Sequence, residues 1–157
     1  MIQRIQSVFL ALIFILGAIL FASPILKFTS YEASFEMNAY KTFNLADHLV
    51  VSNNIGIGAM QGFISLLALT TIFLFKNRQL QIKLCKLNLL LIAIQIAAIV
   101  LYIDVAKEAI SPQNPNDVVI GLAFGFFIPI VSFILTYLSI WFIKKDEDLV
   151  RSADRLR

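Results

Sequence analysis

Long apolar runs, separated by short polar segments, dominate the hydrophobic pattern of this chain. Four of them predict helices that cross a lipid bilayer, because about 20 apolar residues of α-helix span a hydrocarbon core of about 30 Å. They cover residues 8–25, 55–75, 87–103 and 118–143. The last run is longer than the hydrocarbon core is thick, so we expect this helix to tilt or to bend at Pro129.

The pattern therefore predicts an all-α membrane protein, a four-transmembrane-helix bundle that forms a single integral membrane domain of residues 1–157. The segments outside the apolar runs are too short to form a separate soluble domain. Residues 144–157 are predicted to be a helical tail, since Leu149, Ala153 and Leu156 recur at the spacing of one helix face. This tail is either a solvated continuation of the fourth helix or a helix that docks on a partner.

The segment between the first and second apolar runs has a different period. Apolar and polar residues alternate from Tyr31 to Met37, which is typical of a β-strand. A second run, residues 40–45, can pair with this segment through a turn at Asn38 and Ala39. The loop is thus a candidate for a short β-hairpin, which would need a surface to pack on because an isolated hairpin is marginally stable.

The composition agrees with a membrane location. Hydrophobic residues make up 59% of the sequence and charged residues 15%, whereas soluble domains have roughly 45–50% and 25%. The mean hydropathy is +0.84. These values exclude an ordinary soluble domain, and they exclude a disordered chain because disorder requires low hydrophobicity.

Basic residues are distributed unequally between the two sides of the predicted bundle. One side has Arg4, Lys76, Arg78, Lys83, Lys86, Lys144, Lys145, Arg151, Arg155 and Arg157, and the other has Lys27, Lys41 and Lys107. Loops rich in Lys and Arg stay in the cytoplasm, so both termini are predicted to be cytoplasmic. We interpret the net charge of +3 as a topology signal that also attracts anionic lipid headgroups, and we expect no nucleic acid as a partner.

No set of residues indicates catalysis or a cofactor. The chain has one cysteine and one histidine, too few for thiol–disulfide exchange or for a metal or haem site within the membrane. His48 stands beside Asp47, and we interpret it as a polar residue at the start of the second helix. The interiors of the predicted spans contain no charged residue, which argues against a coupled pump. We therefore predict no enzyme activity, catalytic residue, metal or cofactor.

Small residues inside the spans indicate close helix contacts. Gly58 and Gly62 lie four residues apart in the second span, and Gly121 and Gly125 have the same spacing in the fourth. Such pairs let another helix approach closely, which favours association in lipid. The contact is either internal to the bundle or made with another subunit.

Polar residues form one stripe along the third predicted helix. Gln81, Asn88, Gln95 and Tyr102 recur every seven residues and therefore share a face. Buried amides form interhelical hydrogen bonds in lipid, so this face is expected to point into the bundle or toward a protein partner. The alternative is that the stripe lines a path for a neutral solute, together with Gln61.

Three segments of the chain carry a resemblance to a known family. They are residues 1–6 (MIQRIQ), 79–88 (QLQIKLCKLN) and 145–157 (KDEDLVRSADRLR). Along its whole length the chain resembles an uncharacterised family of small four-helix inner-membrane proteins of Bacteroidota, a domain of unknown function. The resemblance implies the bacterial inner membrane and, because all three segments fall on the predicted cytoplasmic side, a contact on that face. The residues expected to make the contact are Arg4, Arg78, Lys83, Lys86, Leu149, Arg151, Asp154 and Arg155.

The predicted architecture is also similar to that of claudin-like proteins, which have four spans and strands in the first outer loop. Those proteins carry a tryptophan and a pair of cysteines in that loop. Here the loop has no cysteine, and Trp141 lies at the cytoplasmic end of the fourth span, where it is expected to anchor the helix at the interface. The similarity is therefore limited to the architecture.

These features favour a non-enzymatic accessory or structural subunit of a larger inner-membrane complex, for example one for protein translocation, insertion or envelope transport. Such a subunit would contact the lipid bilayer and larger inner-membrane proteins through its small-residue helix faces and its cytoplasmic ends. The alternative is a small pore or carrier for a neutral solute. A third hypothesis, an enzyme using Asp47 and His48, lacks further groups for a reaction.

Overall fold

The computed structural model describes residues 3–31, 33–75 and 77–155, and side chains within 5–149 of that range. Its helices are α1 (Gln3–Ala22), α2 (Ile55–Phe73), α3 (Arg78–Ile110) and α4 (Phe124–Arg155). Its strands are β1 (Leu26–Thr29), β2 (Ser34–Met37), β3 (Lys41–Asn44), β4 (Val50–Asn53) and β5 (Val119–Leu122), and a 3-10 turn, η1, covers Pro115–Asp117.

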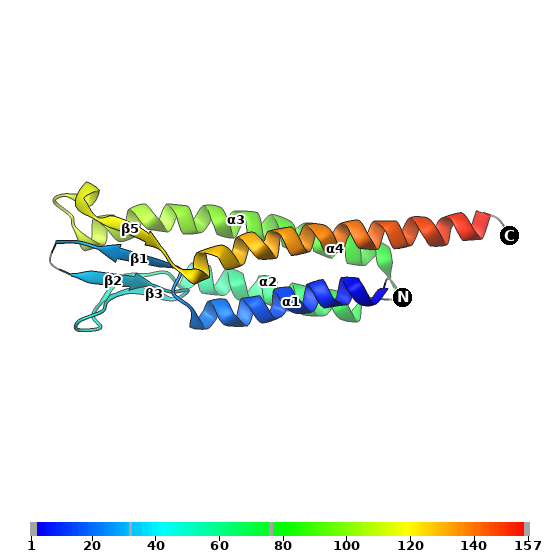
Figure 1. The fold of residues 1–157 in the computed structure, drawn as a ribbon, viewed down its shortest axis with the longest axis horizontal. Coiled ribbons are helices and arrows are strands. Elements are labelled where there is room, and N and C mark those ends of the chain that lie inside the picture. The colour runs from blue at the N-terminus through cyan, green and yellow to red at the C-terminus, as the bar shows by residue number, and fades with distance from the viewer. Residues whose placement is uncertain (1–2, 32, 76, 156–157) are drawn as a thin grey trace.

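The four helices lie side by side along the long axis of the molecule (Figure 1). Helix α1 packs on α2 and α4, and α3 packs on the same two helices. The sheet occupies one end, here called the sheet end, and both termini lie at the other, the terminal end (Figure 1). All four helices are long and apolar enough to cross a membrane.

Each helix buries one face, as the 3.6-residue period requires. In α2 the buried positions include Ile57, Gln61, Ile64, Ala68 and Thr71, which lie three or four residues apart. Most of the positions between them face outward and are apolar, with Thr70 as an exposed polar exception. A helix that is apolar on its outward face suits lipid rather than water.

Helix α3 is longer than a bilayer requires. Its 33 residues extend about 50 Å at the rise of an α-helix. The last turns therefore pass beyond α2 and lie beside the sheet, where Ala106 is buried in one core with Phe28 and Phe35. This end of α3 contacts β4 and the η1 turn. The sheet therefore packs against the last turns of α3, the part of that helix that extends beyond α2.

The sheet has five strands in the order β4-β3-β2-β1-β5, and every neighbouring pair is antiparallel. Strands β1 to β4 connect α1 to α2, while β5 comes from the connection between α3 and α4. Successive side chains alternate between the two faces of the sheet. The core side carries Leu26, Phe28, Phe35 and Met37, and the opposite side carries Lys27, Thr29 and Ser34. One face of the sheet is therefore apolar and covered, and the other is open and carries mostly polar residues along β1 and β2.

The prediction of an all-α fold is wrong. Strands β2 and β3 do pair where a hairpin was expected, and the Asn38 side chain accepts hydrogen bonds from the backbone N–H groups of Tyr40 and Lys41 at their turn. These two strands are, however, the inner part of a larger sheet. Strand β5 lies within the apolar run 118–143 that was assigned to a helix, and α4 begins only at Phe124.

Backbone contacts fix the junction between the sheet and the helices. Gly125 N–H donates to Pro24 O at 2.9 Å, and Ala123 N–H donates to Ile25 O at 3.2 Å. A β-carbon at Gly125 would lie 2.5 Å from Pro24 O, closer than atoms can pack, so only glycine fits there. The start of α4 is thereby held against the end of α1.

A second junction joins the sheet to α2. The backbone N–H of Asn54 donates to Tyr40 O at 2.7 Å, and its side-chain Nδ2 donates to Thr42 Oγ1 at 2.8 Å. Both Asn54 and Thr42 are fully buried. Asn54 therefore ties β3 to the first turn of α2. The sheet is thus attached to the helices at two places, one beside β1 and β5 and the other at β3.

Candidate functional site

Polar side chains meet in the interior between α2 and α3. Gln95 donates from Nε2 to Gln61 Oε1 at 2.9 Å, and Gln61 donates from Nε2 to Ser65 Oγ at 3.2 Å. All three residues are buried. On α1, Gly17 lies directly against this group, since a β-carbon there would overlap Ser65 Oγ and approach Gln61 Nε2 to 2.6 Å. The sequence analysis missed Gly17, which brings α1 close to α2.

The polar stripe of α3 points into the helices, as expected. Near the terminal end, Gln81 donates from Nε2 to Thr71 O at 3.0 Å. Asn88 is 1% exposed, and neither of its amide atoms has a hydrogen-bond partner among the described residues. At the sheet end, the hydroxyl of half-buried Tyr102 lies over the first turn of α2, 3.1 Å from where a β-carbon of Gly56 would be.

The predicted glycine seams take different positions from those expected. Gly58 packs on the turn between β2 and β3, where its N–H donates to Ala39 O at 2.9 Å. Gly121 lies in β5 opposite Lys27, and Gly125 lies in the first turn of α4. Gly121 and Gly125 therefore do not share a helix face, because the helix had been predicted to begin before β5. A β-carbon at Gly62 would meet no atom within 4 Å in the part of the chain that the structure describes, so this position is open.

At the terminal end, a buried aspartate connects three helices. Asp146 of α4 is 9% exposed and accepts a hydrogen bond at Oδ2 from Gln6 Nε2 of α1, at 3.4 Å. The guanidinium of Arg78, the first residue of α3, donates from Nη1 to the backbone oxygen of Asp146 at 3.0 Å. The structure thus brings together the regions of the chain that carry the three segments quoted above.

The other residues predicted for this end are more dispersed. Lys83 and Lys86 are exposed on α3, and Leu149 is exposed on α4. The side chains of Arg4, Arg151, Asp154 and Arg155 lie outside the described residues. Their predicted contact with a partner stays a prediction.

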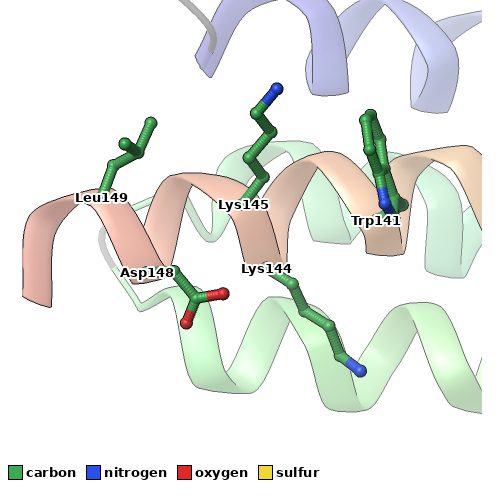
Figure 2. Close-up of a pocket in the computed structure, with 5 residues that line it drawn as sticks. All are labelled: Trp141, Lys144, Lys145, Asp148 and Leu149. Carbon is green, nitrogen blue, oxygen red and sulfur yellow. The ribbon is translucent and has the colours of Figure 1, made fainter. Parts of the chain in front are cut away.

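A hollow of ≈560 Å³ lies on α4 at the terminal end (Figure 2). Its lining residues are Trp141, Lys144, Lys145, Asp148 and Leu149. The Nζ atom of Lys145 lies 5.3 Å from the centroid of the Trp141 ring, within the range of a cation–π contact. Trp141 itself packs edge-to-face on Phe142, with the two ring centroids 4.9 Å apart. From the sequence, Lys144 and Lys145 were interpreted as topology signals, Trp141 as an anchor at the interface, and Leu149 as part of the helical tail. Trp141, Lys145 and Leu149 are each four residues apart, and so are Lys144 and Asp148. This helical spacing was the signal that could have revealed a shared surface.

The turn between β3 and β4 contains Asp47 and His48, both exposed. Asp47 Oδ1 accepts a hydrogen bond from Leu49 N–H at 3.2 Å, and the His48 ring lies 5.9 Å from that of Phe43. The interpretation of His48 as a helix-start residue is wrong, because α2 begins at Ile55. Across the described part of the chain, no three His, Cys, Asp or Glu side chains are grouped so that they could hold a metal ion.

Comparison with known proteins assigns the chain to a family. No protein with a curated description matches the sequence. A family model described as "Domain of unknown function (DUF4293)" matches residues 2–156. The match includes nearly all of the three segments that carried the resemblance, and it extends over the helices and the sheet alike. The chain therefore belongs to the family described as Domain of unknown function (DUF4293).

Proposed function

We propose that this chain is a non-enzymatic accessory subunit of the bacterial inner membrane, which packs through its helices against a larger membrane protein. The observation that carries the proposal is the notch at Gly62 on the outward face of α2. Among the described residues, no atom lies within 4 Å of the point where its β-carbon would be. The large side chains beside the notch are turned outward, with Phe63 66% and Leu66 59% exposed. A small residue between large ones lets a second helix approach closely in lipid.

The enclosed amides of α3 support contact between helices over transport. A solute path needs polar groups that solvent can reach. Gln61, Asn88 and Gln95 are between 0 and 2% exposed, so almost no water-sized space adjoins them. Interhelical hydrogen bonds such as Gln95 to Gln61 instead hold the helices in one arrangement, which a subunit with a fixed binding face requires.

In this proposal the terminal end faces the cytoplasm and the sheet lies outside. The exposed basic residues of α3 and α4 support this orientation, because Lys and Arg are retained on the cytoplasmic side. These residues are Lys83, Lys86, Lys144 and Lys145. The sheet end is then the accessible place for an affinity tag.

The proposal is tested by purification from native membranes. A tag inserted between Asp47 and His48, in the exposed turn of the sheet, leaves both termini and all helices unaltered. We expect the tagged protein to retain a larger membrane protein in fixed stoichiometry in mild detergent. Recovery of a lone monomer or of a homo-oligomer would overturn the proposal.

Two variants test whether the partner protein binds at the Gly62 notch. Gly62→Ile fills a space that is empty within the chain, so it should leave folding intact and remove the partner. Ala97→Ile is the matched control, because Ala97 is also an exposed small residue but belongs to a different helix, α3. Loss of the partner from both variants, or from neither, would contradict binding at Gly62.

A further inference from the structure

We propose that the hollow on α4 binds the headgroup of a phospholipid that carries both a phosphate and a primary ammonium group, as in phosphatidylethanolamine. The hollow, at ≈560 Å³, falls in the range of small-molecule sites. It lies where the apolar part of α4 ends and the Lys144–Lys145 pair begins. This is the depth at which lipid headgroups meet a transmembrane helix.

The charges that line the hollow have both signs. Figure 2 shows two rows on α4: Trp141, Lys145 and Leu149 point to one side, and Lys144 and Asp148 point to the other. The ammonium groups of Lys144 and Lys145 suit a phosphate. The carboxylate of Asp148 repels a purely anionic headgroup, but it suits a headgroup that also carries a cation.

The spacing of these charges fits a short zwitterion. Lys145 and Asp148 are three positions apart on the helix, about 4.5 Å along its axis, and Lys144 is one position further away. Two carbon atoms separate the phosphate from the ammonium group in phosphoethanolamine. One headgroup can therefore reach a lysine with its phosphate and Asp148 with its ammonium group.

Aromatic packing holds the binding groups in place. Trp141 rests on Phe142, and Phe142 lies 5.6 Å from Phe9 of α1, measured between ring centroids. Lys145 is exposed, and its Nζ atom lies 5.3 Å from the centroid of the Trp141 ring. A cation that is already positioned loses less conformational entropy when it binds a phosphate.

An exposed apolar stripe continues from the hollow toward the sheet end. Tyr137 is 61% exposed, Ile134 53% and Ile130 37%. These residues precede Trp141 by four, seven and eleven positions, and so lie on the same face of α4. Acyl chains can lie along this stripe while the headgroup occupies the hollow, which selects a membrane lipid over a soluble phosphate ester.

The test uses the intrinsic fluorescence of Trp141, the one tryptophan of the chain. The full-length protein is reconstituted in bilayers that contain brominated phosphatidylethanolamine, phosphatidylglycerol or phosphatidylcholine, because bromine quenches a nearby indole. We expect phosphatidylethanolamine to quench at about three- to fivefold lower mole fraction than either other lipid, the size expected for one exposed charge pair. Phosphatidylcholine carries the same charges as phosphatidylethanolamine, but its ammonium group has no N–H. Comparing the two lipids therefore distinguishes hydrogen bonding by the N–H groups from attraction to the charge alone. Equal quenching by the three lipids would mean a non-selective interfacial anchor and would overturn the proposal.

Variants test the role assigned to each charge. Asp148→Asn should abolish the preference for phosphatidylethanolamine over phosphatidylglycerol, and Asp148→Glu should restore it. Lys145→Gln should weaken quenching by all three lipids. Glu108→Gln, an exposed carboxylate at the sheet end of α3, is the control and should change nothing. An unchanged lipid preference in Asp148→Asn would contradict the proposal. Because the readout needs no protein partner, it stands or falls independently of the proposed subunit function.

Discussion

The side-chain amide of Gln95 donates a 2.9 Å hydrogen bond to the amide oxygen of Gln61, which joins α3 to α2 in the interior. The acceptor belongs to a residue that itself donates to Ser65 Oγ. No hydrophobic effect drives helices together in lipid, so polar contacts and close packing supply much of the specificity of association. The Gln95–Gln61 bond therefore fixes the relative rotation of two helices.

Replacing both partners of this bond should destabilise the fold by less than the sum of the two single replacements. Gln95→Leu leaves Gln61 Oε1 buried without its donor, and we expect the free energy of unfolding to fall by about 1 kcal/mol. Adding Gln61→Leu removes the unpaired group, so the double variant should lose less than the sum of the single variants. Unfolding in mixed detergent micelles measures the three values. Strict additivity would mean that the bond contributes nothing.

Replacing Asn88 by an apolar residue should stabilise the fold, whereas replacing Gln95 should destabilise it. Both of its amide atoms are buried and unpartnered, so the folded state carries the desolvation of the amide without compensation. Asn88→Leu keeps the branched shape of the side chain and removes this penalty, and we expect the free energy of unfolding to rise by roughly 1–2 kcal/mol. The same unfolding assay measures it. If Asn88→Leu instead reduced flux of a neutral solute through proteoliposomes, the pore hypothesis would regain support.

Two glycines on neighbouring helices should differ sharply in their tolerance of a methyl group. In Gly17→Ala the new β-carbon overlaps Ser65 Oγ, and relief requires the Gln61–Ser65 pair to move. We expect a loss of about 1–3 kcal/mol, typical of overpacking. Gly62→Ala meets open space and should be neutral or slightly stabilising, because alanine favours a helix. Thermal unfolding of the two variants in one detergent compares them, and equal effects would contradict the close approach of α1 to α2.

The sequence was most informative about the helices and their buried faces. A run of about 20 apolar residues has few alternatives to a spanning helix, since an exposed backbone is not tolerated in lipid. The seven-residue spacing of Gln81, Asn88 and Gln95 likewise placed them on one face, expected to point into the bundle or toward a partner, and all three are buried. Local pattern sufficed because both features depend on the helix alone.

The sheet was only partly predictable, because its strands depend on partners distant in sequence. The alternation between Tyr31 and Met37 revealed β2, whereas β5 is a short apolar segment next to a longer apolar run, with no polar residue marking the boundary. Its partner, β1, lies almost one hundred positions earlier, in the register Leu26 to Leu122. The hollow on α4 was missed for a related reason, since Trp141 and Lys145 each have an ordinary interfacial explanation until their ring contact is seen.

The hydrogen bond between Gln6 and Asp146 offers a test of how the terminal end is held together. The carboxylate of Asp146 is 9% exposed and accepts from Gln6 Nε2, so Gln6→Leu deprives a largely buried charged group of a donor. We expect the free energy of unfolding to fall by about 1–3 kcal/mol, the range for removing one partner of a buried polar pair. Lys83→Gln, an exposed substitution at the same end, should change it by less than about 0.5 kcal/mol.

Arg78 should act on the same region through the backbone instead of the carboxylate. Its Nη1 group donates to the backbone oxygen of Asp146, so Arg78→Ala should loosen α4 near this residue without leaving the carboxylate unpaired. Hydrogen exchange of the α4 amides should accelerate locally in Arg78→Ala, whereas Gln6→Leu should also lower global stability. If Arg78→Ala left exchange near Asp146 unchanged, the contact between α3 and α4 would not restrain the end of α4.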